Sequence, residues 1–304
     1  MPAKSKIDLT VVGSLALDTV ATPAATRKDV LGGSVSYACA AAALFTKAGM
    51  VGVAGTDFPR RHRLTLQRRG IDLAGLQQVA GRTFRWSGEY AADLNSRRTL
   101  ATHLNVFANF NPQLPAAYRQ CRVLFLANIH PELQLHVLSQ VQRPALVAAD
   151  TMDFWINSAR RNLQRLIARV DMLLINDAEA RALTGSLNLA QAARKIAAMG
   201  PRYVLIKQGE HGCMLLAGGG ILLLPAFPLA KIVDTTGAGD AFAGGMLGYL
   251  AACPRINAAA ARTAMLYGAI AASFAVESFS IDRLAKLTRR EFNRRLADFR
   301  KMLP

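Results

Sequence analysis

One heptad in the C-terminal third of the chain carries most of its chemical information. It reads Asp234-Thr235-Thr236-Gly237-Ala238-Gly239-Asp240, and a stretch rich in glycine and alanine follows it. Because positions 237–239 carry little or no side chain, their backbone N–H groups can close on an anion, and a helix that begins here adds the positive end of its dipole. Asp240, expected at the first helical position, could accept the proton of a hydroxyl that attacks phosphorus. The heptad therefore predicts phosphoryl transfer, with an acidic helix cap as the simpler alternative.

The heptad resembles the C-terminal signature Asp-Thr-x-Gly-Ala-Gly-Asp of the PfkB family of sugar and nucleoside kinases, and every fixed position matches. The resemblance implies that Asp240 is the catalytic base and that Gly237, Ala238 and Gly239 form the anion hole. It also implies that the cofactors are ATP and Mg²⁺, and that Thr235 belongs to the nucleotide site.

The composition allows a single α/β domain over residues 1–304. The chain is 52% hydrophobic, which suffices for a large core. No apolar run approaches the ~20 residues of a membrane span, and no signal-peptide pattern follows the first residues, so we expect a cytoplasmic protein without a membrane partner. The four cysteines are scattered and form no Cys-x-x-Cys pair, which suggests neither a zinc site nor a disulfide framework.

The formal net charge of +17 is the one compositional feature that favours another class, because such an excess attracts nucleic acid. Its distribution weakens that reading. Basic residues cluster in helix-like segments such as 60–69 and 289–295, which are typical of solvated faces. Nucleic-acid binding is therefore kept only as an alternative.

Apolar runs rich in Val, Ile and Leu alternate with amphipathic segments along the chain. This pattern predicts a three-layer αβα arrangement, with a mostly parallel central sheet covered on both faces. The expected strands are 8–14, 50–54, 123–127, 145–149, 172–175 and 204–207. The expected helices are 34–47, 59–69, 131–140, 161–169, 189–199, 240–252 and 258–276.

Two segments break the alternation. Residues 19–31 and 83–106 are richer in polar residues and strand formers and have no clear helical period. They predict a small β-sheet that projects from the main domain. In the PfkB family such a sheet is a lid that closes on the acceptor and excludes water, and two lids often pair into a homodimer.

The acceptor should bind at the carboxyl ends of the sheet strands. Asp18 follows the first strand, where its carboxylate could accept hydrogen bonds from two substrate hydroxyls. Gly32 and Gly33 resemble the family glycine pair that approaches the sugar. Tyr37 stands where many members have an asparagine that contacts the substrate, which resembles divergent members such as cyclitol kinases. Trp86, on the expected lid, could stack on a base or a sugar, although a packing role is equally open.

The nucleotide side is predicted from two further segments. Asn176 and Glu179 fit the family motif Asn-x-x-Glu after a strand, and could orient the waters of Mg²⁺. The same pair predicts a capping box at a helix start, and both roles can hold together. Lys207, Gly209 and Gly212 resemble the family turn Lys-x-Gly-x-x-Gly near the ATP phosphates.

Other classes fit less well. A P-loop kinase is excluded because the chain has no Gly-Lys dipeptide, and the only Gly-x-Gly that opens a helix has Phe242 where a dinucleotide-binding fold needs its third glycine. The predicted function is ATP-dependent phosphorylation of a hydroxyl on a sugar or nucleoside. The alternatives are a cyclitol kinase of the myo-inositol type, a non-catalytic nucleotide or sugar sensor, and a basic nucleic-acid-binding protein.

Overall fold

A large, mostly parallel sheet forms the centre of the computed structural model, which describes residues 6–94 and 97–303; positions 95 and 96 of the expected lid segment lie outside the described residues. The strand order is β13-β12-β11-β10-β9-β8-β1-β4-β5. Every neighbouring pair is parallel except β11–β12 and β12–β13. The strands are β1 (Leu9–Val12), β4 (Ala48–Gly55), β5 (Asp72–Val79), β8 (Val123–Leu126), β9 (Leu146–Asp150), β10 (Met172–Asn176), β11 (Tyr203–Lys207), β12 (Cys213–Ala217) and β13 (Gly220–Leu224).

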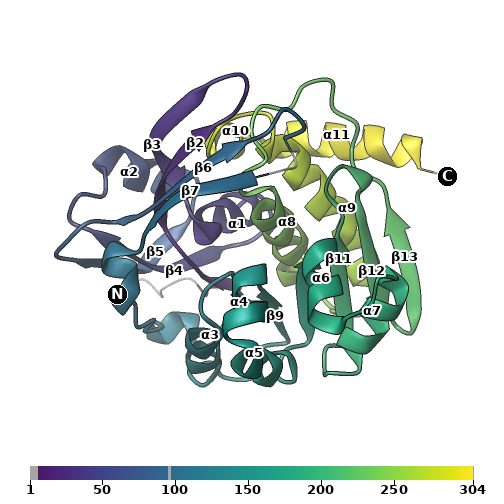
Figure 1. Cartoon of the computed structure of the whole chain (residues 1–304). Helices are drawn as coiled ribbons and strands as arrows, with labels where there is room; N and C mark the ends of the chain where they lie inside the picture. Colours follow the sequence, from purple (N-terminus) through teal and green to yellow (C-terminus); the bar gives the residue numbers. More distant parts are fainter. Residues whose placement is uncertain (1–5, 95–96, 304) are drawn as a thin grey trace.

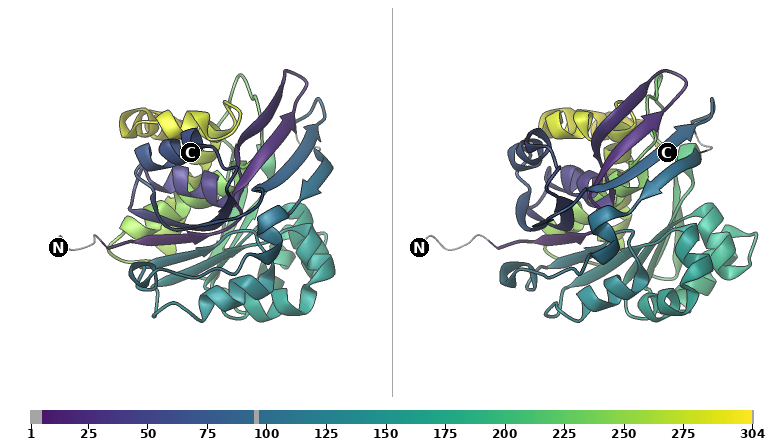
Figure 2. Two further views of the ribbon diagram at one scale, coloured as in Figure 1. Left: turned by 90° about the vertical axis from the view of Figure 1, so that its left-hand side faces the viewer. Right: turned by 60° about the vertical axis from the view of Figure 1, so that its left-hand side comes forward.

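Helices cover both faces of this sheet, as Figure 2 shows. Successive strand side chains point to opposite faces, so Val11 packs in one apolar cluster and Val12 in the other. The first cluster is completed by α1 (Ser34–Ala42), α2 (Arg60–Arg68), α8 (Ala238–Ala252), α9 (Ala258–Ala275), α10 (Asp282–Lys286) and α11 (Arg289–Met302). The second is completed by α3 (Pro131–Leu138), α4 (Asp153–Ser158), α5 (Arg160–Ile167), α6 (Asp177–Thr184) and α7 (Leu189–Ala197). The predicted three-layer αβα class is confirmed.

The glycines of α8 explain why this helix lies deep in the core. A Cβ at Gly244 would stand 2.1 Å from the carbonyl oxygen of Ala38 on α1, and one at Gly245 would stand 2.7 Å from the carbonyl oxygen of Tyr267 on α9. Backbone therefore meets backbone on two sides of α8, which fixes the N-terminus of the helix relative to α1.

The two segments that break the alternation form a separate four-stranded sheet, as predicted. Its order is β3-β2-β6-β7, with β2 (Ala16–Ala21), β3 (Thr26–Gly32), β6 (Phe84–Tyr90) and β7 (Arg97–His103). It projects beyond the large sheet on the side of α1 and α8 (Figure 2). That this sheet moves as a lid stays a prediction.

Several elements were not anticipated. The expected helices 34–47 and 131–140 end early, at Ala42 and Leu138, and β5, β12, β13, α4, α10 and α11 were absent from the prediction. Within the described ranges, no helix combines the length and the hydrophobicity needed to cross a lipid bilayer. All four cysteines are free, and all but Cys253 are buried.

Candidate active site

The N-terminus of α8 forms the floor of the site. Gly237 is its N-cap residue and has the left-handed backbone angles φ 73° and ψ 4°. The helix begins at Ala238, so Asp240 occupies the third helical position and the predicted first position was wrong. The reason is the left-handed turn at Gly237, which starts the helix two residues earlier and is closed by a 3.2 Å hydrogen bond from the Ala238 N–H to the carbonyl oxygen of Thr235.

Tyr37 lies directly behind this turn. A Cβ at Gly237 would stand 2.3 Å from the Tyr37 ring, and the ring is 2% exposed. Burial, together with the charges of Asp18, Asp234 and Asp240, raises the pKa of the Tyr37 hydroxyl well above its ordinary value. The side chain expected to bind substrate therefore packs under the glycine turn, with its hydroxyl within electrostatic range of three carboxylates.

The predicted position of Asp18 at the carboxyl end of a central strand was wrong, because β1 ends at Val12 and the chain then enters β2 of the small sheet, which contains Asp18. Asp18 nevertheless faces the same region. Its side chain is buried, its carboxylate accepts a hydrogen bond from the Gly33 N–H, and its Oδ1 has no hydrogen-bond partner within the part of the chain that the structure describes. A Cβ at Gly32 would stand 1.8 Å from Asp18 Oδ2, so any larger residue there would displace the carboxylate. Desolvation raises the pKa of Asp18 to about 7, with smaller contributions from Asp234 and Asp240. An unpaired buried oxygen of this kind is available to a ligand hydroxyl.

The small sheet presents further side chains beside Asp18. Trp86 on β6 is the register partner of Asp18 on β2, so both side chains lie on one face of the sheet. The Trp86 ring lies over Gly88, and the Arg97 guanidinium stands 5.3 Å from the ring centroid. The aromatic side chain and the predicted substrate carboxylate are thus neighbours.

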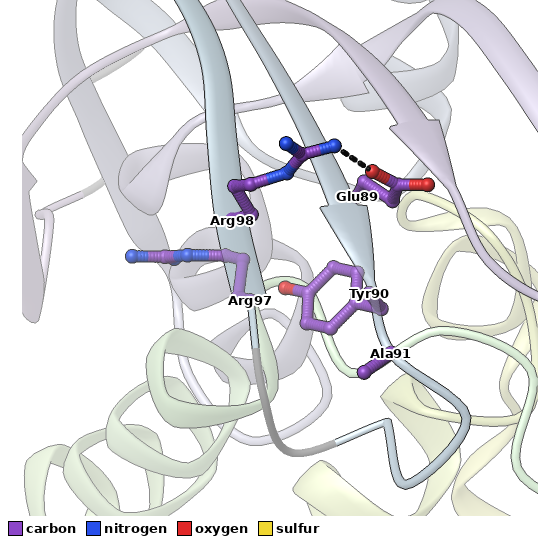
Figure 3. Close-up of a pocket in the computed structure, with 5 residues that line it drawn as sticks. All are labelled: Glu89, Tyr90, Ala91, Arg97 and Arg98. Carbon is purple, nitrogen blue, oxygen red and sulfur yellow. Dashed lines mark hydrogen bonds and ion pairs between the residues drawn. The ribbon is translucent and has the colours of Figure 1, made fainter.

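A pocket of about 390 Å³ opens at the free end of this sheet (Figure 3). Figure 3 shows Arg98 turned toward Glu89, with which it forms an ion pair, while Arg97 extends away from them. The positive charge of Arg97 lowers the pKa of both Asp18 and Asp240, against the larger effect of desolvation. Arg97 therefore lies within electrostatic range of both carboxylates.

Two hydrogen bonds join the small sheet to the heptad. The Thr235 hydroxyl donates to the carbonyl oxygen of Leu94 at 2.7 Å, and the hydroxyls of Thr236 and Tyr90 lie 3.0 Å apart. The hydroxyl of Thr235, predicted for the nucleotide site, is thus engaged with the loop after β6. Asp234 is buried and accepts from the Thr236 N–H at 2.8 Å, which shapes the turn from within.

Asn176 and Glu179 form the predicted capping box at the start of α6. The Glu179 N–H donates to Asn176 Oδ1 at 2.8 Å, and the Asn176 N–H donates to Glu179 Oε2 at 2.9 Å. Desolvation and the neighbouring Asp150 raise the pKa of Glu179 to about 7. The capping role is confirmed, and the carboxyl group is close enough to the charged cluster to be perturbed by it.

Lys207 ends β11 and makes a buried ion pair with Asp150, which ends β9. The Lys207 Nζ lies 2.7 Å from Asp150 Oδ2, and the two side chains are 17% and 5% exposed. A Cβ at Gly239 would stand 3.1 Å from the Lys207 Nζ, so this ammonium lies beside the first turn of α8. The lysine is therefore held in the site rather than solvated.

Gly209 and Gly212 shape the turn between β11 and β12. Their φ angles are 58° and 94°, and a Cβ at Gly212 would stand 2.0 Å from the Leu224 carbonyl oxygen. The turn is closed by a 2.8 Å hydrogen bond from the Gln208 N–H to the Gly212 carbonyl oxygen. Both glycines are required by the turn itself.

Two carboxyl groups with raised pKa values, Glu179 and Asp240, lie within electrostatic range of the Lys207 ammonium, which is paired with Asp150 at the N-terminus of α8. Desolvation and the charge of Asp150 raise the pKa of Asp240 to about 7, whereas Lys207 opposes the rise. The arrangement fits a nucleotide phosphate, because the α8 amides and Lys207 offer donors and the small residues 237–239 leave space.

Among residues 6–94 and 97–303, no three acidic, histidine or cysteine side chains come close enough to hold a metal ion. A divalent ion here would depend on phosphate oxygens and water, as Mg²⁺ often does.

The sequence profile of the pfkB family carbohydrate kinases matches residues 6–284. The chain belongs to the PfkB family. Members of this kinase family transfer a phosphoryl group from ATP to a hydroxyl of a small sugar or nucleoside. A cytidine kinase from Thermococcus kodakarensis is 31% identical over 267 residues, which cover 84% of this chain and 95% of the relative.

Solved structures agree with the PfkB fold. The nucleoside kinase of Methanocaldococcus jannaschii, described as an archaeal member of the ribokinase family, has a TM-score of 0.77 at 20% identity, over 97% of this chain and 99% of that one. The nucleoside kinase of Burkholderia thailandensis, solved in complex with inosine, has a TM-score of 0.76 at 20% identity, over 95% and 97% of the two chains. At these identities the likeness shows the fold.

Sequence reasoning missed two residues of the PfkB-type site. Asp150 had a usable signal, because it directly follows the predicted strand 145–149, at the carboxyl end where open α/β sheets bind ligands. Tyr90 had none, since its contact with Thr236 joins positions 146 residues apart.

Proposed function

We propose that this chain is an ATP- and Mg²⁺-dependent nucleoside kinase that phosphorylates a ribose hydroxyl, with cytidine as the first candidate acceptor. The observation that carries the proposal is the pairing of Asp18 with Trp86 on one face of the small sheet. A carboxylate can bind the ribose hydroxyls while the neighbouring indole stacks on the base. The 31% identity to a cytidine kinase supports the same acceptor class.

Asp240 is the general base in this proposal. It accepts the proton of the attacking hydroxyl, and its raised pKa brings it close to the working pH that proton transfer favours. The N–H groups of Gly237, Ala238 and Gly239 hold the negative charge that develops on the transferring group, in the manner of an oxyanion hole. Tyr37 keeps Gly237 in place from behind.

ATP is the phosphoryl donor, and its phosphates lie against the α8 N-terminus and Lys207. Asn176, Gly209, Gly212 and Thr235 belong to the surroundings of the nucleotide. Mg²⁺ would neutralise phosphate charge when bound, and Glu179 would contact it through water. On the acceptor side, Gly32 and Gly33 leave the space that Asp18 and the ribose need.

Acceptor-dependent ADP release tests the proposal. With Mg·ATP, cytidine, inosine and adenosine are compared with ribose, fructose and myo-inositol, and we expect a nucleoside to give the highest kcat/KM. Turnover only with ribose, fructose or myo-inositol would refute the nucleoside assignment but leave the kinase class intact. Bound ATP without turnover on any acceptor would favour a sensor.

Trp86 provides a matched test of base stacking. Since the chain has two tryptophans, Trp155→Phe leaves Trp86 as the only one, and its fluorescence should be quenched by the nucleoside but not by ribose. Base stacking is worth about 1–3 kcal/mol, so Trp86→Ala should lower kcat/KM for the nucleoside by about 5- to 150-fold. The Trp155→Phe variant alone is the control and should keep its activity.

The small sheet also supports a proposed homodimer. Strand β7 is at the edge of that sheet, and most of its side chains are exposed, including Leu100 at 52%. An exposed edge strand favours pairing with another copy. Sedimentation equilibrium should show a dimer, and Leu100→Lys should shift it toward monomer.

A further inference from the structure

The ion pair between Asp150 and Lys207 is placed where it can act on ATP. The register pairs Leu174 with Asp150 and Asn176 with Lys207, so the two charged residues flank the end of β10 on either side. Their strand neighbours Ala148 and Leu205 pack in the cluster that includes α8. Because side chains two positions apart share a face, Asp150 and Lys207 also point toward α8.

The Lys207 side chain lies across the first turn of α8. A Cβ at Gly239 would meet its Nζ at 3.1 Å, its Cδ at 3.6 Å and its Cε at 3.7 Å. The ammonium is thus adjacent to the N–H groups that would receive a phosphoryl group. A long, flexible lysine holds such a position only if another group fixes its end.

Asp150 supplies that fixed point. Its Oδ2 accepts from the Lys207 ammonium, its Oδ1 accepts from the Thr151 N–H at 2.8 Å, and its backbone carbonyl accepts from the buried Gln134 amide at 3.0 Å. Burial alone would lower the pKa of Lys207, but Asp150 and Glu179 raise it, so the ammonium stays charged. The carboxylate is itself immobile and can hold the lysine in one orientation.

We propose that Asp150 is a positioning residue that holds the Lys207 ammonium over the α8 N-terminus, where the ammonium contacts the γ-phosphoryl group of ATP. The inference rests on the proposed kinase function. Lys207 keeps its ion pair with Asp150 and presents its remaining N–H groups to the phosphoryl oxygens, since an ammonium has three donors. Such a contact is absent with ADP, which lacks the γ-phosphoryl group.

Nucleotide discrimination provides the test. The dissociation constants of ADP and of the β,γ-methylene analogue of ATP are measured by calorimetry with Mg²⁺ for the wild type, Asp150→Asn, Asp150→Glu and Lys207→Met. Loss of a charge-assisted hydrogen bond should weaken the analogue by about tenfold or more in Asp150→Asn and Lys207→Met. Affinity for ADP should stay within about threefold, and Asp150→Glu should recover part of the loss.

Asp171 provides the matched control. It forms an ion pair with Arg202 at 3.2 Å and also accepts from a backbone N–H, but it precedes β10 instead of following a strand. Asp171→Asn should leave both dissociation constants unchanged. If an Asp150 variant loses affinity for ADP and for the analogue by the same factor, the ratio of the two dissociation constants is unchanged. That result would show a merely structural role of Asp150 and overturn the proposal. If the wild type phosphorylates no acceptor, the proposed kinase function is refuted. The ratio of the two dissociation constants still tests the role of Asp150, because nucleotide binding is measured without an acceptor.

Discussion

Replacing Asp240 by asparagine should inactivate the protein and stabilise it at the same time. General-base catalysis contributes about 10²- to 10⁴-fold, and kcat should fall by that range because the amide cannot accept the proton. A rise of the pKa from its ordinary 3.8 to about 7 corresponds to about 4 kcal/mol of unfavourable free energy once the carboxylate is ionised. Since the side chain is only half-buried, solvent screening reduces the expected gain to about 1–3 kcal/mol.

The gain in stability must depend on pH in a defined direction. The folded protein holds the Asp240 proton more tightly than the unfolded chain, so the wild type loses stability as pH rises from about 4 to about 7, and the asparagine variant does not. Urea unfolding at pH 5 and pH 8 measures this, with Asp298→Asn, at an exposed position of α11, as the control for the same chemical change. Residual turnover near the wild-type rate would refute the base assignment. An equal effect of Asp240→Asn at both pH values would refute the desolvation argument.

Three further predictions concern other parts of the molecule. Gly244→Ala places a Cβ 2.1 Å from the backbone of α1 and should lower the free energy of unfolding in urea by about 1–3 kcal/mol, whereas Gly220→Ala, with 3.5 Å of space, should not. Tyr90→Phe removes the partner of the Thr236 hydroxyl, worth about 1 kcal/mol, so kcat should fall about fivefold and acceptor-independent ADP release should rise. The pH profile of kcat/KM should fall below about pH 7, where Asp240 binds its proton, and a profile that is flat to pH 5 would contradict this.

Most of the central sheet could be predicted because buried parallel strands are continuous apolar runs. Strand β9 illustrates this, since Leu146–Asp150 differs from the expected 145–149 by one residue at each end. Strand β13 was missed because it lies at the edge of the sheet and is not a buried core strand. Leu223, for example, is 64% exposed although the segment is apolar. Helix α11 was missed because its many arginines make the segment polar on average. Its three buried residues, Phe292, Leu296 and Phe299, are brought to one face by the helical period.

The candidate site was predictable where one local motif contains the chemistry. The capping box of Asn176 and Glu179 is of this kind, because both partners lie within four positions. The contact of Tyr37 with Gly237 joins positions 200 residues apart, and only the packing of α1 against α8 brings them together. Local spacing in the sequence therefore indicates what chemistry a residue can perform, whereas tertiary packing determines which distant residues it contacts.

The two hydrogen bonds between the small-sheet region and the heptad link the position of the small sheet to the shape of the turn before α8. Any movement of the small sheet away from α8 must break the contacts of Thr235 with Leu94 and of Thr236 with Tyr90 together. The turn that precedes α8 would then lose two of its supports at the same time. In the proposed kinase, the position of the small sheet and the geometry of the turn are therefore coupled through these two contacts.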